Sequence, residues 1–217
     1  DQRFGQGYYL SQLGPEEIVL IRTAEEKSSI QKLVNGWLER MPFLQEAELW
    51  SDFEASSSPG SAEGYSDPFF PHYRSAYFQS LSEGELNNRQ GFDATFREQL
   101  TADRSFSPSA CRSALFIMLY RGYPMLQLPF SLLQVLLELD EQLSTWRFRH
   151  LSMVQRMIGS RIGTGGSTGK DYLRSALEKH AIFSELAGLT SFLIERNRLP
   201  ALGRRMQLRL GFAESRL

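Results

Sequence analysis

The chain has 217 residues, of which 41% are hydrophobic, and its formal net charge is −1 at pH 7. This length and apolar content can support a sizeable core, and they favour a single domain over residues 1–217. The near-zero net charge gives no general attraction to nucleic acid or to an anionic membrane, and no apolar run is long enough to span a bilayer. We therefore expect partners that are neither nucleic acid nor a membrane.

The N-terminal part predicts a helix followed by an insertion. Thr23-Ala24-Glu25-Glu26 matches a capping box, which indicates a helix start. The apolar positions that follow at helical spacing are Ile30, Leu33, Val34, Trp37, Leu38 and Met41. Pro42 ends this helix, which we expect to lie in the core. Residues 52–67 are rich in Ser, Gly, Glu and Pro, so we predict a flexible insertion that buries too little apolar surface to order.

Two further helices are indicated in the middle and near the end of the chain. Ser107 and Pro108 suit a helix start, and Cys111 keeps helical spacing with the apolar residues that follow. We expect Cys111 to be a small buried residue and not a nucleophile, and a lone cysteine is compatible with a reducing cytoplasm. A later helix is predicted to begin near Asp171 and to carry His180 at a partly exposed edge of the core.

A long helix is predicted from Pro129 to Gly159, about 30 residues or roughly 45 Å in length. Its apolar stripe consists of Leu132, Leu136, Leu139, Leu143, Trp146, His150, Met153 and Met157. The stripe predicts that His150 faces packed protein. One imidazole can bind a haem iron, whose equatorial ligands come from the porphyrin, but it cannot hold zinc alone. From these residues alone, a hydrogen-bonded core histidine and a haem ligand both remain open.

A glycine-rich loop follows at residues 163–172. It is not a phosphate loop, because Thr164 stands at the first glycine position and Asp171 replaces the hydroxyl residue that would contact magnesium. The dinucleotide pattern fails too, since it requires glycine at Thr168. Two interpretations remain: a loop whose hydroxyls close around the carboxylate or ammonium of a small ligand, and a simple turn between helices.

The most specific stretches are Trp146-Arg147-Phe148-Arg149-His150, Gly163-Thr164-Gly165-Gly166-Ser167-Thr168-Gly169 and Tyr172-Leu173-Arg174-Ser175. Together they closely resemble the C-terminal part of tryptophan 2,3-dioxygenases, and the resemblance extends upstream to Trp37-Leu38-Glu39-Arg40 and downstream to Leu189-Thr190-Ser191-Phe192-Leu193-Ile194. It implies an all-α fold, a helical bundle of the haem-dependent tryptophan dioxygenase type. It also implies haem b with His150 as the axial ligand of the iron, and Thr164 binding the amino-acid end of the substrate.

The resemblance further implies an activity. Both atoms of O2 would be inserted across the indole C2–C3 bond of L-tryptophan to give N-formylkynurenine, the first step of tryptophan degradation by the kynurenine pathway. The family implies a cytoplasmic homotetramer, and we assign no further catalytic residue. Two alternatives stay open: a truncated relative that binds haem or an aromatic metabolite without turnover, and a haem-dependent aromatic amino-acid hydroxylase.

The chain also departs from the family. Lys170 stands where many members have an aromatic residue or histidine, and Glu195 replaces a usual proline. The family's N-terminal portion, which supplies the oxygen-side pocket, has no counterpart among these 217 residues. Arg147 and Arg149 would either form a solvated face or neutralise haem propionates. Trp146 would pack in the core or against the porphyrin edge.

Overall fold

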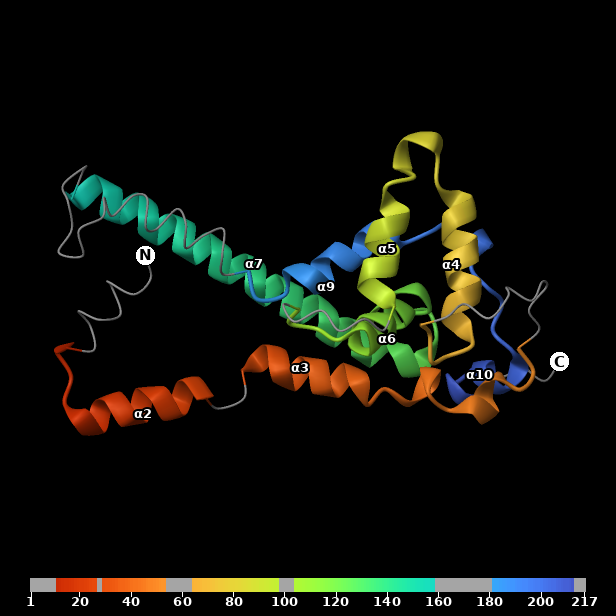
Figure 1. The fold of residues 1–217 in the computed structure, drawn as a ribbon, viewed down its shortest axis with the longest axis horizontal. Helices are drawn as coiled ribbons and strands as arrows, with labels where there is room; N and C mark the ends of the chain where they lie inside the picture. The colour runs from red at the N-terminus through yellow and green to blue at the C-terminus, as the bar shows by residue number, and fades with distance from the viewer. Residues whose placement is uncertain (1–10, 27–28, 54–63, 98–103, 159–180, 213–217) are drawn as a thin grey trace. The chain divides into compact units, whose positions relative to one another are not determined.

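The computed structural model describes residues 11–26, 29–53, 64–97, 104–158 and 181–212, and every regular element in these ranges is helical. The all-α prediction is therefore confirmed. The α-helices are α2 (Pro15–Glu26), α3 (Ile30–Glu39), α4 (Phe69–Ser80), α5 (Asn88–Phe96), α6 (Pro108–Leu119), α7 (Pro124–Ile158), α9 (Ser184–Gly188) and α10 (Arg204–Arg209) (Figure 1). Short 3-10 helices are η1 (Pro42–Leu44), η2 (Ala47–Trp50), η3 (Glu83–Glu85), η4 (Leu189–Phe192) and η5 (Arg196–Arg198).

The contacts divide the chain into two compact units. One unit comprises residues 1–30 and 137–183, and the other comprises residues 31–136 and 184–217. Helix α7 contributes residues 124–136 to the unit formed by residues 31–136 and 184–217, and its remaining residues to the other unit. Within the described ranges, no helix combines the length and apolar character needed to cross a bilayer.

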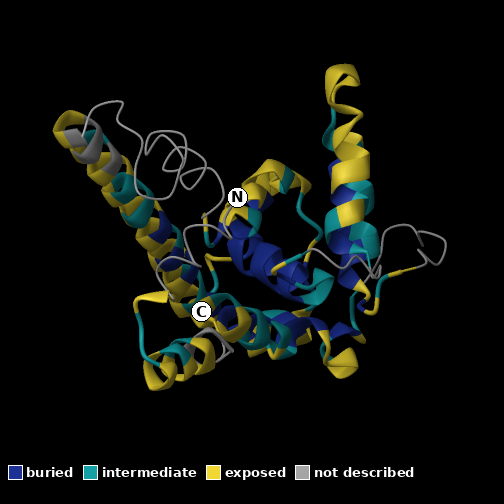
Figure 2. Ribbon diagram, turned by 60° about the vertical axis from the view of Figure 1, so that its left-hand side comes forward, coloured by how far each residue is buried: buried dark blue, intermediate teal, exposed yellow. Residues whose placement is uncertain are grey.

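Helix α6 is the buried centre of the unit formed by residues 31–136 and 184–217 (Figure 2). Its start is the one the sequence predicts, since the Ser107 hydroxyl oxygen accepts a hydrogen bond from the Ala110 amide at 3.2 Å. Cys111 is completely buried, and this burial raises the pKa of its thiol to about 12. The thiol therefore stays protonated at neutral pH, in agreement with the prediction that Cys111 is not a nucleophile.

Aromatic side chains fill the space around α6. Phe69 packs against Trp50 at 5.7 Å and against Phe116 at 5.3 Å between ring centroids. Two buried tyrosines then fasten the C-terminal segment to this cluster, because Tyr73 donates to the Phe192 carbonyl and Tyr120 donates to the Pro200 carbonyl, each at 2.6 Å. Burial raises the pKa of both phenols, so they remain donors at any ordinary pH.

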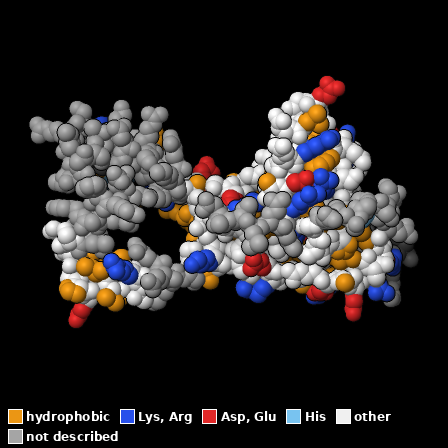
Figure 3. Space-filling view, viewed as in Figure 1, with side chains coloured by type: hydrophobic (Ala, Val, Ile, Leu, Met, Phe, Trp, Pro, Cys, Tyr) orange, Lys and Arg blue, Asp and Glu red, His pale blue; other side chains and the backbone are white. Residues whose placement is uncertain are grey.

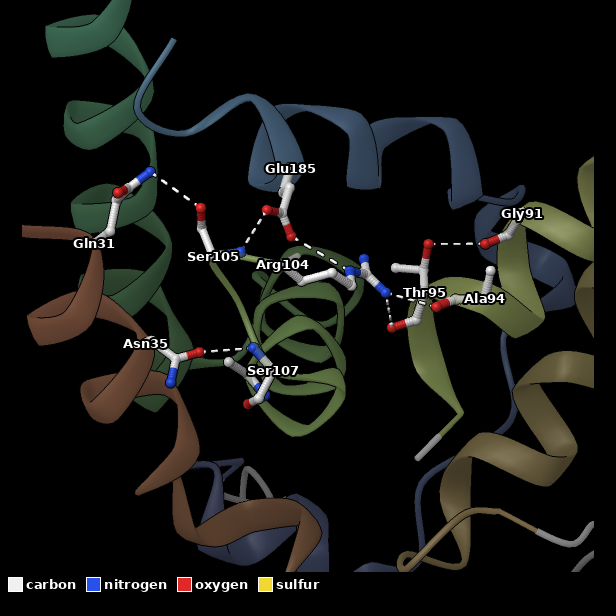
Figure 4. A network of polar contacts seen from close by, with 10 residues as sticks. Gln31, Asn35, Gly91, Ala94, Thr95, Arg104, Ser105, Ser107 and Glu185 are labelled. Atoms are coloured by element: carbon white, nitrogen blue, oxygen red, sulfur yellow. Dashed lines mark hydrogen bonds and ion pairs between the residues drawn. The ribbon is translucent and has the colours of Figure 1, made fainter. Parts of the chain in front are cut away.

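Polar contacts connect α3, α5 and α9 to the segment that enters α6 (Figure 4). Glu185 accepts a hydrogen bond from the Ser105 amide at 2.8 Å and lies 3.5 Å from Nε of Arg104. Arg104 also donates to the Ala94 carbonyl at 2.6 Å. The Asn35 side chain accepts from the Ser107 amide at 2.8 Å. The bonds accepted by Glu185 and Asn35 satisfy the amides of Ser105 and Ser107 just before α6, while Arg104 satisfies a carbonyl near the end of α5.

A buried ion pair joins the predicted insertion to the core. Nε of Arg112 lies 3.1 Å from Oδ2 of Asp67, and the two side chains are only 2% and 3% exposed. Asp67 also accepts from the Phe70 amide at 2.9 Å, so its carboxylate fixes the start of α4. Residues 54–63 of the predicted insertion lie outside the described residues. The prediction is wrong for its C-terminal end, because the charge of Arg112 draws Asp67 into the core.

The N-terminal helix boundaries differ from the sequence prediction. Thr23 lies inside α2 and its hydroxyl donates to the Val19 carbonyl at 2.8 Å, so the capping-box prediction is wrong. A threonine inside a helix can bond back to the preceding turn in this way, which the local pattern does not reveal. In α3, Val34 and Leu38 are buried as predicted, whereas Leu33 is largely exposed.

Helix α7 begins at Pro124, earlier than predicted, and Pro129 lies within it. Pro124 suits the first helical position, and the Met125 amide donates to the Leu210 carbonyl at 3.1 Å, which anchors the first turn. Buried Leu126 and Leu133 on either side of Pro129 provide packing that offsets its missing hydrogen bond. The helix is described as far as Ile158, and the predicted end at Gly159 lies outside the described residues.

The predicted orientation of α7 is wrong. Its buried side carries Leu126, Leu133, Leu136 and Asp140, whereas much of the predicted stripe is exposed. Leu132 and Leu139 are about two-fifths exposed, and Met157 is 78% exposed. Apolar residues recur at three- and four-residue steps along two neighbouring faces of this helix. Periodicity alone cannot decide which face packs, and the tertiary contacts place the other face inward.

Candidate functional site

His150 lies near the C-terminal end of α7, in the unit formed by residues 1–30 and 137–183. Its side chain is exposed, so the prediction that it faces packed protein is wrong. The imidazole stacks on the indole of Trp146, with ring centroids 5.5 Å apart and an interplanar angle of 11°. Side chains four residues apart on a helix are neighbours, and this stacking holds the imidazole against the helix surface.

The surface around His150 is apolar and exposed. Trp146 is 62% exposed, and Met153 and Met157 on the following turns are also exposed. Phe148, beside this stripe, is exposed as well. An apolar surface of this extent around one polar group is a common feature of ligand-binding and protein-binding faces. The arrangement presents an imidazole among exposed apolar side chains of α7.

The charged residues nearby are basic. Arg149 is exposed next to His150, and Arg156 lies further along the helix, where its Nε donates to the Ser152 carbonyl at 3.4 Å. Within the described part of the chain, no three His, Cys, Asp or Glu side chains gather into a metal site. A metal bound at His150 would therefore need most of its ligands from a cofactor, as haem provides. One accessible imidazole, apolar surroundings and arginines for the propionates fit haem.

The other predicted site residues do not join His150 in the described structure. Thr164 and His180 lie outside the described residues. His72 belongs to the other unit, where its Nδ1 contacts the Pro68 carbonyl at 2.9 Å and its ring packs edge-on against Phe53. His72 is thus held in a local packing role at the start of α4.

The role of Asp140 was not predicted from the sequence. This buried carboxylate on α7 accepts hydrogen bonds from the Ile182 amide at 3.0 Å and the Phe183 amide at 2.9 Å. It therefore attaches the chain that enters α9 to the helix carrying His150. Its partners lie 42 and 43 residues away in the sequence, so no local pattern could indicate these bonds.

Comparison with known proteins adds to this geometry. Residues 5–193 match the family model described as tryptophan 2,3-dioxygenase. The chain is 35% identical to the tryptophan 2,3-dioxygenase of Alteromonas mediterranea, over 96% of this chain and 60% of that protein. It is 37% identical to the enzyme of Bdellovibrio bacteriovorus, over 85% of this chain and 54% of that protein, and 33% identical to that of Dictyostelium discoideum, over 98% and 56%. The chain thus spans little more than half the length of these relatives.

Proposed function

Because the chain belongs to the tryptophan 2,3-dioxygenase family, we propose that it functions in the haem-dependent oxidation of L-tryptophan to N-formylkynurenine. In this reaction the indole C2–C3 bond breaks and each carbon gains one oxygen atom from O2. All the atoms of both substrates enter the product, so no external reductant is consumed. The observation that carries the proposal is the family match over residues 5–193, which includes His150.

His150 would hold the haem. Its exposed imidazole offers a nitrogen at the apolar face of α7, and Trp146 stacked against it restricts the orientation of the ring. Met153 and Met157 would cover apolar parts of the macrocycle, while Arg149 is available to neutralise a propionate. When bound, haem supplies the iron at which O2 is activated.

The substrate side of the proposal concerns Thr164. We assign its hydroxyl to the amino-acid end of L-tryptophan, on the match of the surrounding glycine-rich sequence to the family. Orienting a substrate in this way accounts for much of the proximity advantage of an enzyme. Asp140 on α7, the helix that carries His150, binds the Ile182 and Phe183 amides.

A closed site needs more surface than α7 provides. Oxygen chemistry on a reactive substrate requires a pocket that excludes water, and the described side chains around His150 are exposed. The relatives are longer than this chain, and we assign the covering wall to sequence that the chain does not span. Assembly as a homotetramer in the cytoplasm completes the proposal, as the resemblance implies.

Haem titration of the purified chain tests the proposal at its first step. We expect a one-to-one complex with the visible absorption spectrum of histidine-ligated ferrous haem, and a shift of that spectrum on addition of L-tryptophan. His150→Gly should lose this spectrum, and added imidazole should restore it by filling the space of the lost ring. His72→Gln, which removes an imidazole from the other unit, is the matched control and should retain it. Full haem binding by the His150→Gly variant without imidazole would refute the assignment.

A second function is favoured by the openness of the same face. With His150, Trp146 and Met157 all exposed, the chain could bind haem or an aromatic metabolite without turnover. A tryptophan-dependent spectral shift accompanied by N-formylkynurenine in a stopped assay supports the dioxygenase. The shift without product supports the binding protein, and formation of a hydroxylated aromatic amino acid would instead support the hydroxylase.

A further inference from the structure

A second candidate site lies far along the sequence from His150, in the other unit. A cavity of about 230 Å³ opens between the end of α4, η3, the start of α5 and the segment from Ser191 to Arg198. At roughly 30 Å³ per water molecule, it could hold about eight waters or a ligand with a similar number of non-hydrogen atoms. Its lining residues are Tyr77, Ser80, Leu81, Glu85, Asn88, Ser191, Leu193, Ile194, Glu195 and Arg198.

Polar groups from separate elements converge at this cavity. The Tyr77 hydroxyl donates to the Ser191 carbonyl at 3.3 Å, which is long enough for a ligand to compete for the phenol. Burial, together with the nearby charge of Glu85, raises the pKa of Tyr77, so the phenol remains protonated. Asn88, at the start of α5, contributes an amide to the same lining. Convergent polar groups in a concave site are the usual means of orienting a small ligand.

The charges of the lining favour a cation. Glu195 and Arg198 form an ion pair at 3.5 Å and largely neutralise one another. Glu85 accepts two hydrogen bonds from Ser82, both at Oε2, which leaves Oε1 available. These bonds lower the pKa of Glu85, so its carboxylate is ionised at neutral pH. The lining thus carries two carboxylates and one guanidinium, and Figure 3 shows acidic side chains at the end of the α4–α5 pair, where η3 lies.

One wall of the cavity comes from the segment after η4. It consists of Ile194 and Glu195, which precede η5, and Arg198, the last residue of η5. Glu195 is the residue before η5, and its carboxylate adds a negative charge to this wall of the lining. We infer that this cavity binds a small organic ammonium compound, with the ammonium group placed between Glu85, Asn88 and Tyr77.

An ammonium group occurs in simple amines and in amino acids, and the two classes differ in whether they can also pair with Arg198. The carboxylate of an amino acid could pair with this guanidinium while its ammonium pairs with Glu85. An amino alcohol has only the second interaction. The shared ammonium defines the site, and the response to Arg198→Gln distinguishes the two classes of ligand.

A titration of the full chain with ethanolamine, followed by NMR of backbone amides, tests this inference. We expect saturable shifts at Asn88, Ser191 and Leu193, and no such shifts with ethylene glycol, which has the same size but no charge. Glu85→Gln should weaken binding about fivefold or more, because the charge-assisted hydrogen bond is lost while the glutamine still accepts from Ser82. Glu83→Gln removes the same charge from η3 outside the lining, and should leave the affinity within about twofold.

Glycine supplies the second arm of the titration. Tighter binding of glycine than of ethanolamine, abolished by Arg198→Gln, would identify amino acids as the ligand class, whereas equal binding would identify simple amines. The inference would be overturned by the absence of saturable shifts, by equal shifts with ethylene glycol, or by an unchanged affinity in the Glu85→Gln variant. None of these outcomes depends on haem.

Discussion

Replacing Arg112 tests how the core of the unit formed by residues 31–136 and 184–217 is held together. The Arg112 guanidinium pairs with Asp67 and donates to the Phe96 carbonyl at 2.7 Å and to the Ser66 hydroxyl at 3.0 Å. It thereby joins α6, the end of α5 and the start of α4. Arg112→Met keeps much of the side-chain volume but removes the charge and every donor.

The expected cost follows from what the substitution leaves behind. Asp67 would remain a buried carboxylate, with the Phe70 amide as a neutral donor and no cation, and the Phe96 carbonyl would lose a donor. Removing one partner of a buried ion pair typically lowers the free energy of unfolding by about 3–5 kcal/mol. Because domains are stable by only about 5–15 kcal/mol, this loss should be conspicuous. Asp67→Asn in the same chain removes the orphaned charge and should recover about 2 kcal/mol or more relative to the sum of the single changes.

Urea unfolding followed by tryptophan fluorescence provides the measurement, since buried Trp50 reports on this unit. Arg198→Met is the matched control, because Arg198 pairs with Glu195 where the two side chains are 50% and 69% exposed. Arg198→Met should lower the free energy of unfolding by less than about 1 kcal/mol. The reasoning would be refuted if Arg112→Met cost no more than Arg198→Met, or if the effects of Asp67→Asn and Arg112→Met were simply additive.

Three further predictions concern single contacts. Gly203→Ala should lower the free energy of unfolding by about 1–3 kcal/mol, because a Cβ there would lie 2.5 Å from Oδ1 of Asp52. This side chain cannot simply move away, since its other oxygen accepts a hydrogen bond from the Arg205 amide in α10. An unchanged midpoint of urea unfolding would contradict the prediction. Asp140→Ala should speed hydrogen exchange at the Ile182 and Phe183 amides by removing their acceptor, whereas unchanged protection would show that other contacts hold this segment. Partial burial alone would raise the pKa of Asp93, but the hydrogen bonds and charge of Arg74, with the charge of Arg97, outweigh it and lower the pKa. The stabilisation from Asp93 should therefore be complete above about pH 4 and be lost as the pH falls below it, and Asp93→Asn should flatten acid unfolding there; equal acid sensitivity of both proteins would contradict the assignment.

Local signals predicted several elements well. Ser107 followed by Pro108 marks the start of α6, because a helix cap acts through neighbouring backbone groups. The burial of Cys111 followed from its helical spacing with other apolar residues. The family resemblance rests on linear motifs and is likewise a property of the sequence, and it identifies His150 as the candidate ligand.

The contacts that hold the fold together could not be predicted in this way. Asp67 with Arg112, Tyr73 with Phe192, and Asp140 with Phe183 each join residues far apart in the chain, and nothing in their local patterns distinguishes them from solvated polar residues. Pro129 gave a misleading helix start because packing on both sides of it outweighs the lost hydrogen bond.

Helix α7 shows which features followed from the sequence and which depended on the tertiary structure. Its sequence predicted an amphipathic helix over most of residues 124–158, in which His150 shares a stripe with Trp146 and Met153. Only the tertiary structure decided that most of this stripe is exposed while the neighbouring face, with Leu126 and Leu133, packs inward. Helical periodicity depends on neighbours within one turn, whereas the choice of the buried face depends on the surfaces that distant segments bring to the helix.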